Sequence, residues 1–152
     1  MITEQNKAVL RRFCEITVKP DPTPVKSLLA PGFIANGSEN QDDFIQHLTY
    51  FLTAFSDTYF TVEEQIAEGD QVVTLGTWGG THNGMFQGVP PTGKKVAVSA
   101  VLIDRLEDGK IVDHRGLFDT LGIMQQVGLV ILIGLMAFAF YNDILRVIRG
   151  WG

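Results

Sequence analysis

The stretch KVAVSAVLIDRLEDGKIVDHRGLFD, residues 95–119, carries the pattern that decides the fold. Apolar and polar residues alternate on both sides of Glu107-Asp108-Gly109, a sequence typical of a tight turn between antiparallel strands. The same alternation occurs earlier, on both sides of Glu68-Gly69-Asp70. The second part of the chain therefore predicts a meander of four long strands over residues 58–67, 71–80, 95–106 and 110–119.

Helical periodicity precedes these strands. Apolar residues recur at helical spacing over 4–17 and 41–55, which predicts two amphipathic helices. Between them, Thr23-Pro24 predicts the N-cap and first turn of a short helix to Ala30. A short strand is expected over 33–36. Helices followed by an antiparallel meander indicate an α+β domain, with a curved antiparallel sheet packed against three N-terminal helices.

The composition limits the possible functions. With 45% hydrophobic and 19% charged residues, the 152-residue chain has the composition of a globular domain. Its net charge is −5, and it has no cluster of Lys and Arg, so we expect no nucleic-acid partner. The single cysteine, Cys14, excludes an intrachain disulfide. Three scattered histidines do not form a metal-ligand pattern, and we expect no metal.

Two segments resemble the SnoaL-like polyketide cyclase family. GTWGGTHNGMFQGVPPTGKKV (76–96) contains the GTH-x-G-x-F-x-G-x-PPTGK hairpin, and IDRLEDGKIVDHRGLFDTLGIMQQVG (103–128) contains the R-x-x-DGKI strand pair and a QQLG-type turn. The resemblance implies a cone fold shared with nuclear transport factor two. It also implies cofactor-independent acid/base chemistry, either ring closure by intramolecular aldol condensation or isomerisation, on a small apolar or aromatic carbonyl ligand. A non-catalytic ligand-binding module is the alternative, because this fold hosts both.

The resemblance implies that Asp119, at the end of the last strand, is the acid/base residue. A histidine assists this aspartate in the cyclases, and the nearest position in this chain is Arg105, which we expect to bind an oxyanion or to form a structural salt bridge. Asp119 directly precedes an apparent helix start, so helix capping is the other interpretation. A second departure is Gly116, where relatives usually carry a bulky aromatic residue.

Other side chains are candidates for the pocket wall. A group of aromatic and polar residues is predicted to contact the ligand: Trp78, His82, Phe86, Phe118, Asn36 and Tyr50. His114 has the opposite strand parity from Asp119 and is expected at the surface or in sheet packing. His47 is expected to be exposed.

The C-terminal segment belongs to no part of this pattern. Residues 127–141, VGLVILIGLMAFAFY, contain no charge, so we divide the chain into a cone domain (1–126) and a hydrophobic helix (127–152). The segment resembles the last membrane helix of site-two-type proteases, but the chain contains no HExxH. Three interpretations stay open: membrane contact through 127–148, burial against a second subunit of a homodimer, or a fusion artefact. We expect a cytoplasmic domain in each case.

Overall fold

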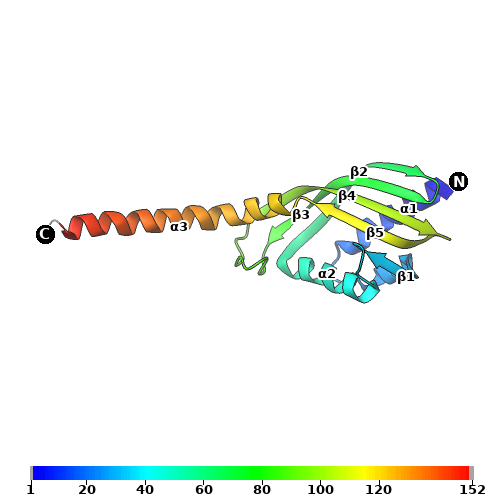
Figure 1. Cartoon of the computed structure of the whole chain (residues 1–152), viewed down its shortest axis with the longest axis horizontal. Coiled ribbons are helices and arrows are strands. Elements are labelled where there is room, and N and C mark those ends of the chain that lie inside the picture. The colour runs from blue at the N-terminus through cyan, green and yellow to red at the C-terminus, as the bar shows by residue number, and fades with distance from the viewer. Residues whose placement is uncertain (1, 151–152) are drawn as a thin grey trace.

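The computed structural model describes the backbone of residues 2–150 and the side chains of that range outside 129–134. Five strands form one curved sheet in the order β1-β5-β4-β3-β2, and the helices α1 and α2 lie against it (Figure 1). The elements are α1 (Ile2–Thr17), η1 (Thr23–Leu28), β1 (Leu29–Ala35), α2 (Gln41–Ala54), β2 (Phe55–Glu68), β3 (Gln71–His82), β4 (Lys95–Glu107), β5 (Lys110–Phe118) and α3 (Thr120–Gly150). The predicted α+β fold is confirmed.

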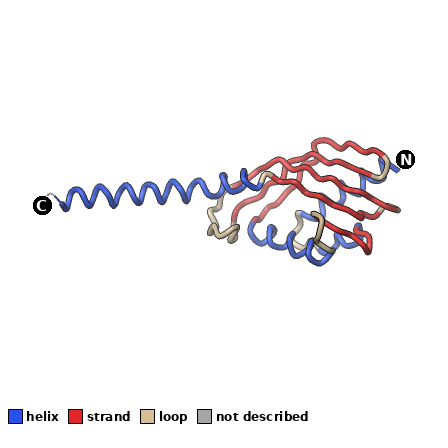
Figure 2. Tube along the Cα trace, in the orientation of Figure 1, coloured by secondary structure: helices blue, strands red, loops and turns tan. Residues whose placement is uncertain are grey.

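Alternation along the strands builds the core. In β4 the even-numbered side chains from Val96 to Leu106 are buried, whereas the odd-numbered ones are exposed or partly exposed. The buried face of the sheet packs against α1 and α2, which supply Leu10, Phe13 and Phe44 to the same cluster. Both helices lie on one side of the sheet (Figure 2), and the other face of the sheet is left exposed or partly exposed along β4.

The capping residues of α2 and the turn residues between β4 and β5 form the local structures expected of their residue types. Asn40 caps α2 in a reciprocal capping box: its side chain accepts from the Asp43 N–H, and the Asp43 carboxylate accepts from the Asn40 N–H. The β4–β5 turn places Asp108 and Gly109 at φ 50° and 74°, the left-handed pair that a two-residue hairpin needs.

The region between the first two long helices differs from the prediction. The short helix η1 is a 3-10 helix that ends at Leu28, and Leu29 already begins β1. Thr23 is not its N-cap, because its N–H and hydroxyl both donate to Asp21. The strand β1 pairs with β5 in parallel, so the sheet is antiparallel only from β5 to β2.

The C-terminal helix α3 is continuous across the predicted boundary at residue 127. Its first turns belong to the domain, since Ile123 and Val127 are buried, and the remainder extends away from the sheet (Figure 1). Beyond the undescribed side chains, large apolar residues are exposed, including Met136, Phe138 and Phe140. Among the described residues, no helix is long and apolar enough to cross a membrane. The homodimer contact stays a prediction.

Candidate functional site

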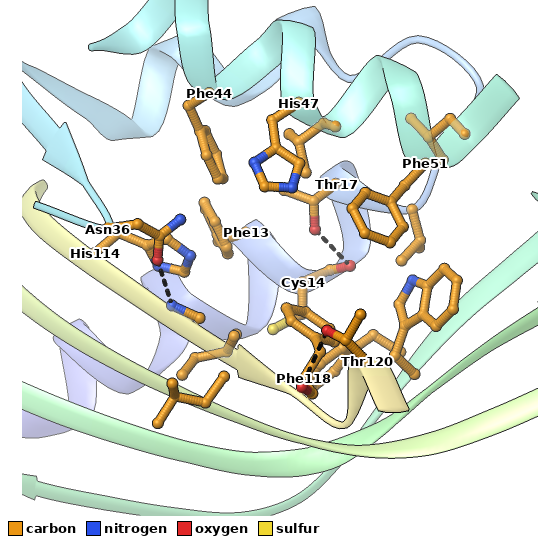
Figure 3. Close-up of a pocket in the computed structure, with 18 residues that line it drawn as sticks. Phe13, Cys14, Thr17, Asn36, Phe44, His47, Phe51, His114, Phe118 and Thr120 are labelled. Carbon is orange, nitrogen blue, oxygen red and sulfur yellow. Dashed lines mark hydrogen bonds between the residues drawn. The ribbon is translucent and has the colours of Figure 1, made fainter. Parts of the chain in front are cut away.

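A cavity of about 340 Å³ lies between the buried face of the sheet and the helices α1 and α2. Figure 3 shows the side chains of both layers converging on it. Aromatic and aliphatic groups dominate its wall, and two histidines interrupt them. The lining residues are Phe13, Cys14, Thr17, Val18, Asn36, Phe44, His47, Leu48, Phe51, Leu52, Phe60, Trp78, Leu102, His114, Gly116, Leu117, Phe118 and Thr120.

His114 lines the cavity and is hydrogen-bonded to a buried aspartate, Asp104. The His114 Nδ1–H donates to Asp104 Oδ1 over 2.6 Å, and the two side chains are 5% and 0% exposed. The imidazole packs beside the stacked rings of Phe13 and Phe44, with centroids 5.0 and 5.2 Å away. Because Nδ1 is bound to Asp104, the second ring nitrogen, Nε2, takes no part in this hydrogen bond. His114 can therefore exchange a proton with a bound ligand through Nε2.

Burial sets the electrostatics of this pair. Desolvation raises the pKa of Asp104, whereas the charge and hydrogen bond of His114 lower it, and the Asp113 carboxylate raises it further. Asp104 Oδ2 is buried and has no hydrogen-bond partner among the described residues. His114 is thus the group that makes burial of this carboxylate tolerable, and the carboxylate in turn fixes the imidazole orientation.

A one-residue bulge brings the pair together. Leu106 pairs with Ile111, but Arg105 pairs with Asp113, so Val112 is the extra residue in β5. Beyond the bulge, Asp104 lies opposite His114 and both face inward. Without this shift, Asp104 would lie opposite Asp113 and His114 would point outward.

The turn after β1 supplies the polar groups at one side of the cavity. Asn36 adopts φ 51°, its N–H donates to the His114 carbonyl, and its Oδ1 accepts from the Gly116 N–H over 3.1 Å. Gly116 leaves open space next to the histidine, because a Cβ there would lie 3.4 Å from His114 Nε2. The missing side chain thus keeps Nε2 accessible from the cavity.

A second histidine enters the cavity from α2. His47 Nδ1 lies 3.1 Å from Glu39 Oε1, and its ring stacks on Phe51 with the centroids 5.3 Å apart. Unlike His114, the His47 side chain is 45% exposed. The expectation that His47 is exposed is confirmed in part, but the ring is also a wall of the cavity.

The two residues predicted to be catalytic lie elsewhere. Asp119 is exposed and caps α3, because its Oδ1 accepts from the Gly122 N–H over 2.8 Å. It is absent from the cavity wall, although its neighbours Phe118 and Thr120 belong to it. Arg105 lies on the outer face of β4, 2.8 Å from Glu107 and 4.0 Å from Asp70. The structure therefore does not bring Arg105 and Asp119 together, and a role of Asp119 in proton transfer stays a prediction.

The predicted wall residues divide into two groups. Trp78, Phe118 and Asn36 line the cavity. His82 and Phe86 are fully buried in a second core cluster or beside it, and His82 Nδ1 is bound to Thr92. The Tyr50 hydroxyl accepts from the Gln87 N–H instead of facing the cavity.

The pairing of Asp104 with His114 was not predicted from the sequence, and His114, expected at the surface or in sheet packing, is buried and lines the cavity. One signal was present, since Asp104 is the only charged residue among the even-numbered positions of β4, which are otherwise apolar. A charge on a core face marks a paired, buried group. Among the described residues, no group of three or more side chains has the composition of a metal site.

The fold and cavity place the chain among small cone-shaped α+β proteins that hold an apolar cavity between a curved sheet and its helices. Residues 7–127 match the family described as SnoaL-like polyketide cyclase, and the chain belongs to this family. It is 32% identical over 103 residues to the aklanonic acid methyl ester cyclase of Streptomyces peucetius, which covers 66% of this chain and 71% of the relative. It is 34% identical over 86 residues to the nogalonic acid methyl ester cyclase of Streptomyces nogalater, covering 56% and 64%.

Solved structures share this fold but are described with different activities, AclR as a hydroxylase and IdmH as a polyketide cyclase. AclR of Streptomyces galilaeus superposes with a TM-score of 0.76 at 26% identity, over 83% of this chain and 97% of AclR. IdmH of Streptomyces antibioticus superposes with a TM-score of 0.74 at 25% identity, over 82% and 99%. The superposed share, 82% to 83% of this chain, is similar in extent to the family match over residues 7–127.

Proposed function

We propose that this protein closes a ring in an aromatic polyketide ester by cofactor-independent acid/base chemistry, with His114 as the base. The buried His114–Asp104 pair at the cavity wall carries the proposal. The relatives named as methyl ester cyclases indicate the substrate class. Isomerisation of a small apolar carbonyl compound uses the same first step.

The cavity suits a flat, largely apolar ligand. Its volume of about 340 Å³ lies at the lower end of the range for small-molecule sites, roughly 300–1,000 Å³. Phe51, Trp78 and Phe118 provide aromatic surfaces, and the pairs Phe51–Trp78 and Trp78–Phe118 meet edge to face. Such walls favour stacked rings over a flexible polar chain.

The chemistry starts at the free edge of the imidazole. His114 Nε2 takes the proton from a carbon next to a carbonyl, and the resulting enolate carbon attacks a second carbonyl of the same molecule. A C–C bond forms, and the oxygen of the attacked carbonyl takes up a proton. Asp104 holds the imidazole in the tautomer that presents a lone pair at Nε2 and stabilises the imidazolium that forms.

The test uses aklanonic acid methyl ester and nogalonic acid methyl ester as probes, with product followed by chromatography. His114→Asn is the informative variant, because its amide N–H occupies the position of Nδ1 and keeps a donor for Asp104 while Nε2 is lost. We expect turnover to fall by roughly 10²–10⁴-fold, the range for a lost general base. Asp119→Asn keeps the helix cap and is expected to leave turnover unchanged.

Each other outcome has a clear meaning. Loss of turnover in Asp119→Asn with retention in His114→Asn would move the base to Asp119, as the family resemblance predicts. Binding of both esters by the wild-type protein without any product would refute the enzyme and favour the ligand-binding module. Calorimetric titration with each ester distinguishes that case from a failure to bind.

A further inference from the structure

The cavity wall contains a second histidine, His47, which has its own carboxylate partner, Glu39, and which the proposed base does not use. We propose that His47, oriented by Glu39, is a second catalytic residue, which donates the proton to the oxygen formed at ring closure. This inference rests on the proposed function and assigns its acid. His114 projects from β5 and His47 from α2, so the two imidazoles enter the cavity from opposite layers (Figure 3).

The position of His47 is fixed by its neighbours. The residue lies in the middle of α2, and its ring stacks on Phe51 at an interplanar angle of 22°. Phe44, one turn earlier on the same helix, packs on His114. The α2 face that covers the cavity is therefore apolar except for one imidazole, as Figure 3 shows.

Glu39 is held in place more firmly than an ordinary surface carboxylate. Its backbone forms two hydrogen bonds with Ala35, one in each direction, at 2.7 and 2.8 Å. Its side chain is 26% exposed, and Oε2 is buried without a hydrogen-bond partner in the described part of the chain. With Nδ1–H of His47 directed to Oε1, the opposite nitrogen, Nε2, is left for a ligand.

The two histidines differ in their access to solvent. His114 packs against the rings of Phe13 and Phe44 and is buried. The His47 side chain is 45% exposed beside the Glu39 carboxylate, so after donating a proton to the ligand it can regain one from water.

These two histidines account for both proton transfers of the reaction. His114 Nε2 accepts the carbon-bound proton, the C–C bond forms, and the carbonyl π electrons move to oxygen. The His47 imidazolium donates its Nε2 proton to that oxygen and becomes neutral. One turnover thus leaves His114 protonated and His47 neutral, and exchange with solvent restores both without any oxidant or second reactant.

The test separates proton removal from ring closure. With the two methyl esters in D₂O, mass spectrometry follows deuterium entering the unreacted ester, which needs only the base, while chromatography follows cyclised product. His47→Asn keeps an N–H donor for Glu39 but lacks Nε2. We expect it to lower ring closure by about 100-fold while deuterium entry continues. His114→Asn, the matched variant, is expected to lose both.

Glu39→Gln provides a second readout, because it keeps a hydrogen-bond acceptor and removes the charge. We expect an intermediate loss of ring closure with unchanged affinity for the ester. Ring closure at the wild-type rate in a folded His47→Asn would overturn the role of His47 and leave His114 unaffected. Absence of both deuterium entry and product in the wild-type protein would overturn the proposed function and this inference with it.

Discussion

Replacing His114 by Phe isolates the energetic role of the His114–Asp104 pair. Asp104 is 0% exposed at its side chain, its hydrogen bond to His114 is 2.6 Å long, and its other oxygen has no partner among the described groups. A phenyl ring fills the space of the imidazole beside Phe13 and Phe44, so little packing is lost. What is lost is the hydrogen-bond donor of Asp104, and removing one member of a buried pair costs about 3–5 kcal/mol of stability. We expect the free energy of unfolding to fall by about 3 kcal/mol at pH 7, the lower end of this range, because Asp104 can take up a proton and so avoid an unpaired buried charge.

The double variant decides whether this cost belongs to the pair. Asp104→Leu alone leaves His114 Nδ1 without an acceptor, at a cost of roughly 1–3 kcal/mol for a buried unsatisfied polar group. Asp104→Leu combined with His114→Phe leaves neither group, and two apolar side chains replace the pair. We therefore expect the double variant to be more stable than His114→Phe alone, with a coupling energy above about 1 kcal/mol.

Urea unfolding at pH 7, followed by far-UV circular dichroism, measures the four free energies of the cycle. Equal slopes against urea concentration are needed for the comparison, because a changed slope means a changed native or denatured state. Additivity of the two single effects within about 0.5 kcal/mol would refute the reasoning, since independent sites behave in that way.

Three further predictions follow from single groups. Burial raises the pKa of the Cys14 thiol to about 12, so roughly one thiol in 10⁴ is ionised at pH 8, and we expect alkylation by iodoacetamide only in urea; rapid labelling of the native protein would contradict this. Asp119→Ala should lower the free energy of unfolding by about 1 kcal/mol through the lost cap of α3, whereas Asp119→Asn should leave it within a few tenths; equal losses would exclude capping. The folded-state pKa of Asp104 lies above its ordinary value of 3.8, so its contribution to stability is complete below pH 3.8 and is lost as pH rises through the folded-state pKa. We therefore expect the stability of the wild type relative to Asp104→Asn to decline from pH 3.5 to pH 7. A rise over this range would mean that folding lowers the pKa of Asp104.

Periodicity was sufficient for the regular part of the fold. The apolar repeat over 4–17 and 41–55 and the alternation in the four long strands correspond to α1, α2 and β2–β5 within a few residues. These patterns work because burial on one face dictates the spacing of apolar side chains. The short stretch 23–36 was less well predicted, since a 3-10 helix and an edge strand paired in parallel leave little periodic signal.

The sequence identifies Asp119 and Arg105 as charged residues on or beside the last two strands, but it does not reveal their roles. Strand parity does place Arg105 on the same face as Ile103, but that face is the outer one. Asp119 stands after the last strand residue, where alternation no longer applies and the first N–H groups of α3 need an acceptor. A carboxylate at the end of a strand is thus ambiguous until the direction of the following helix is known.

The polar groups of the cavity owe their positions to irregular backbone, and its apolar wall to regular elements. Because Val112 is bulged out of the ladder with β4, His114 faces inward and meets Asp104. A left-handed Asn36 reverses the chain after β1, and this turn presents both the Asn36 amide and the Glu39 carboxylate that holds His47. Deleting Val112 would leave the pairs Arg105–Asp113 and Asp104–His114 as a regular ladder, so we expect that variant to lose the bulge and keep His114 on the inner face. The chemistry of this cone therefore depends on one bulge and one turn, neither of which has a periodic signature.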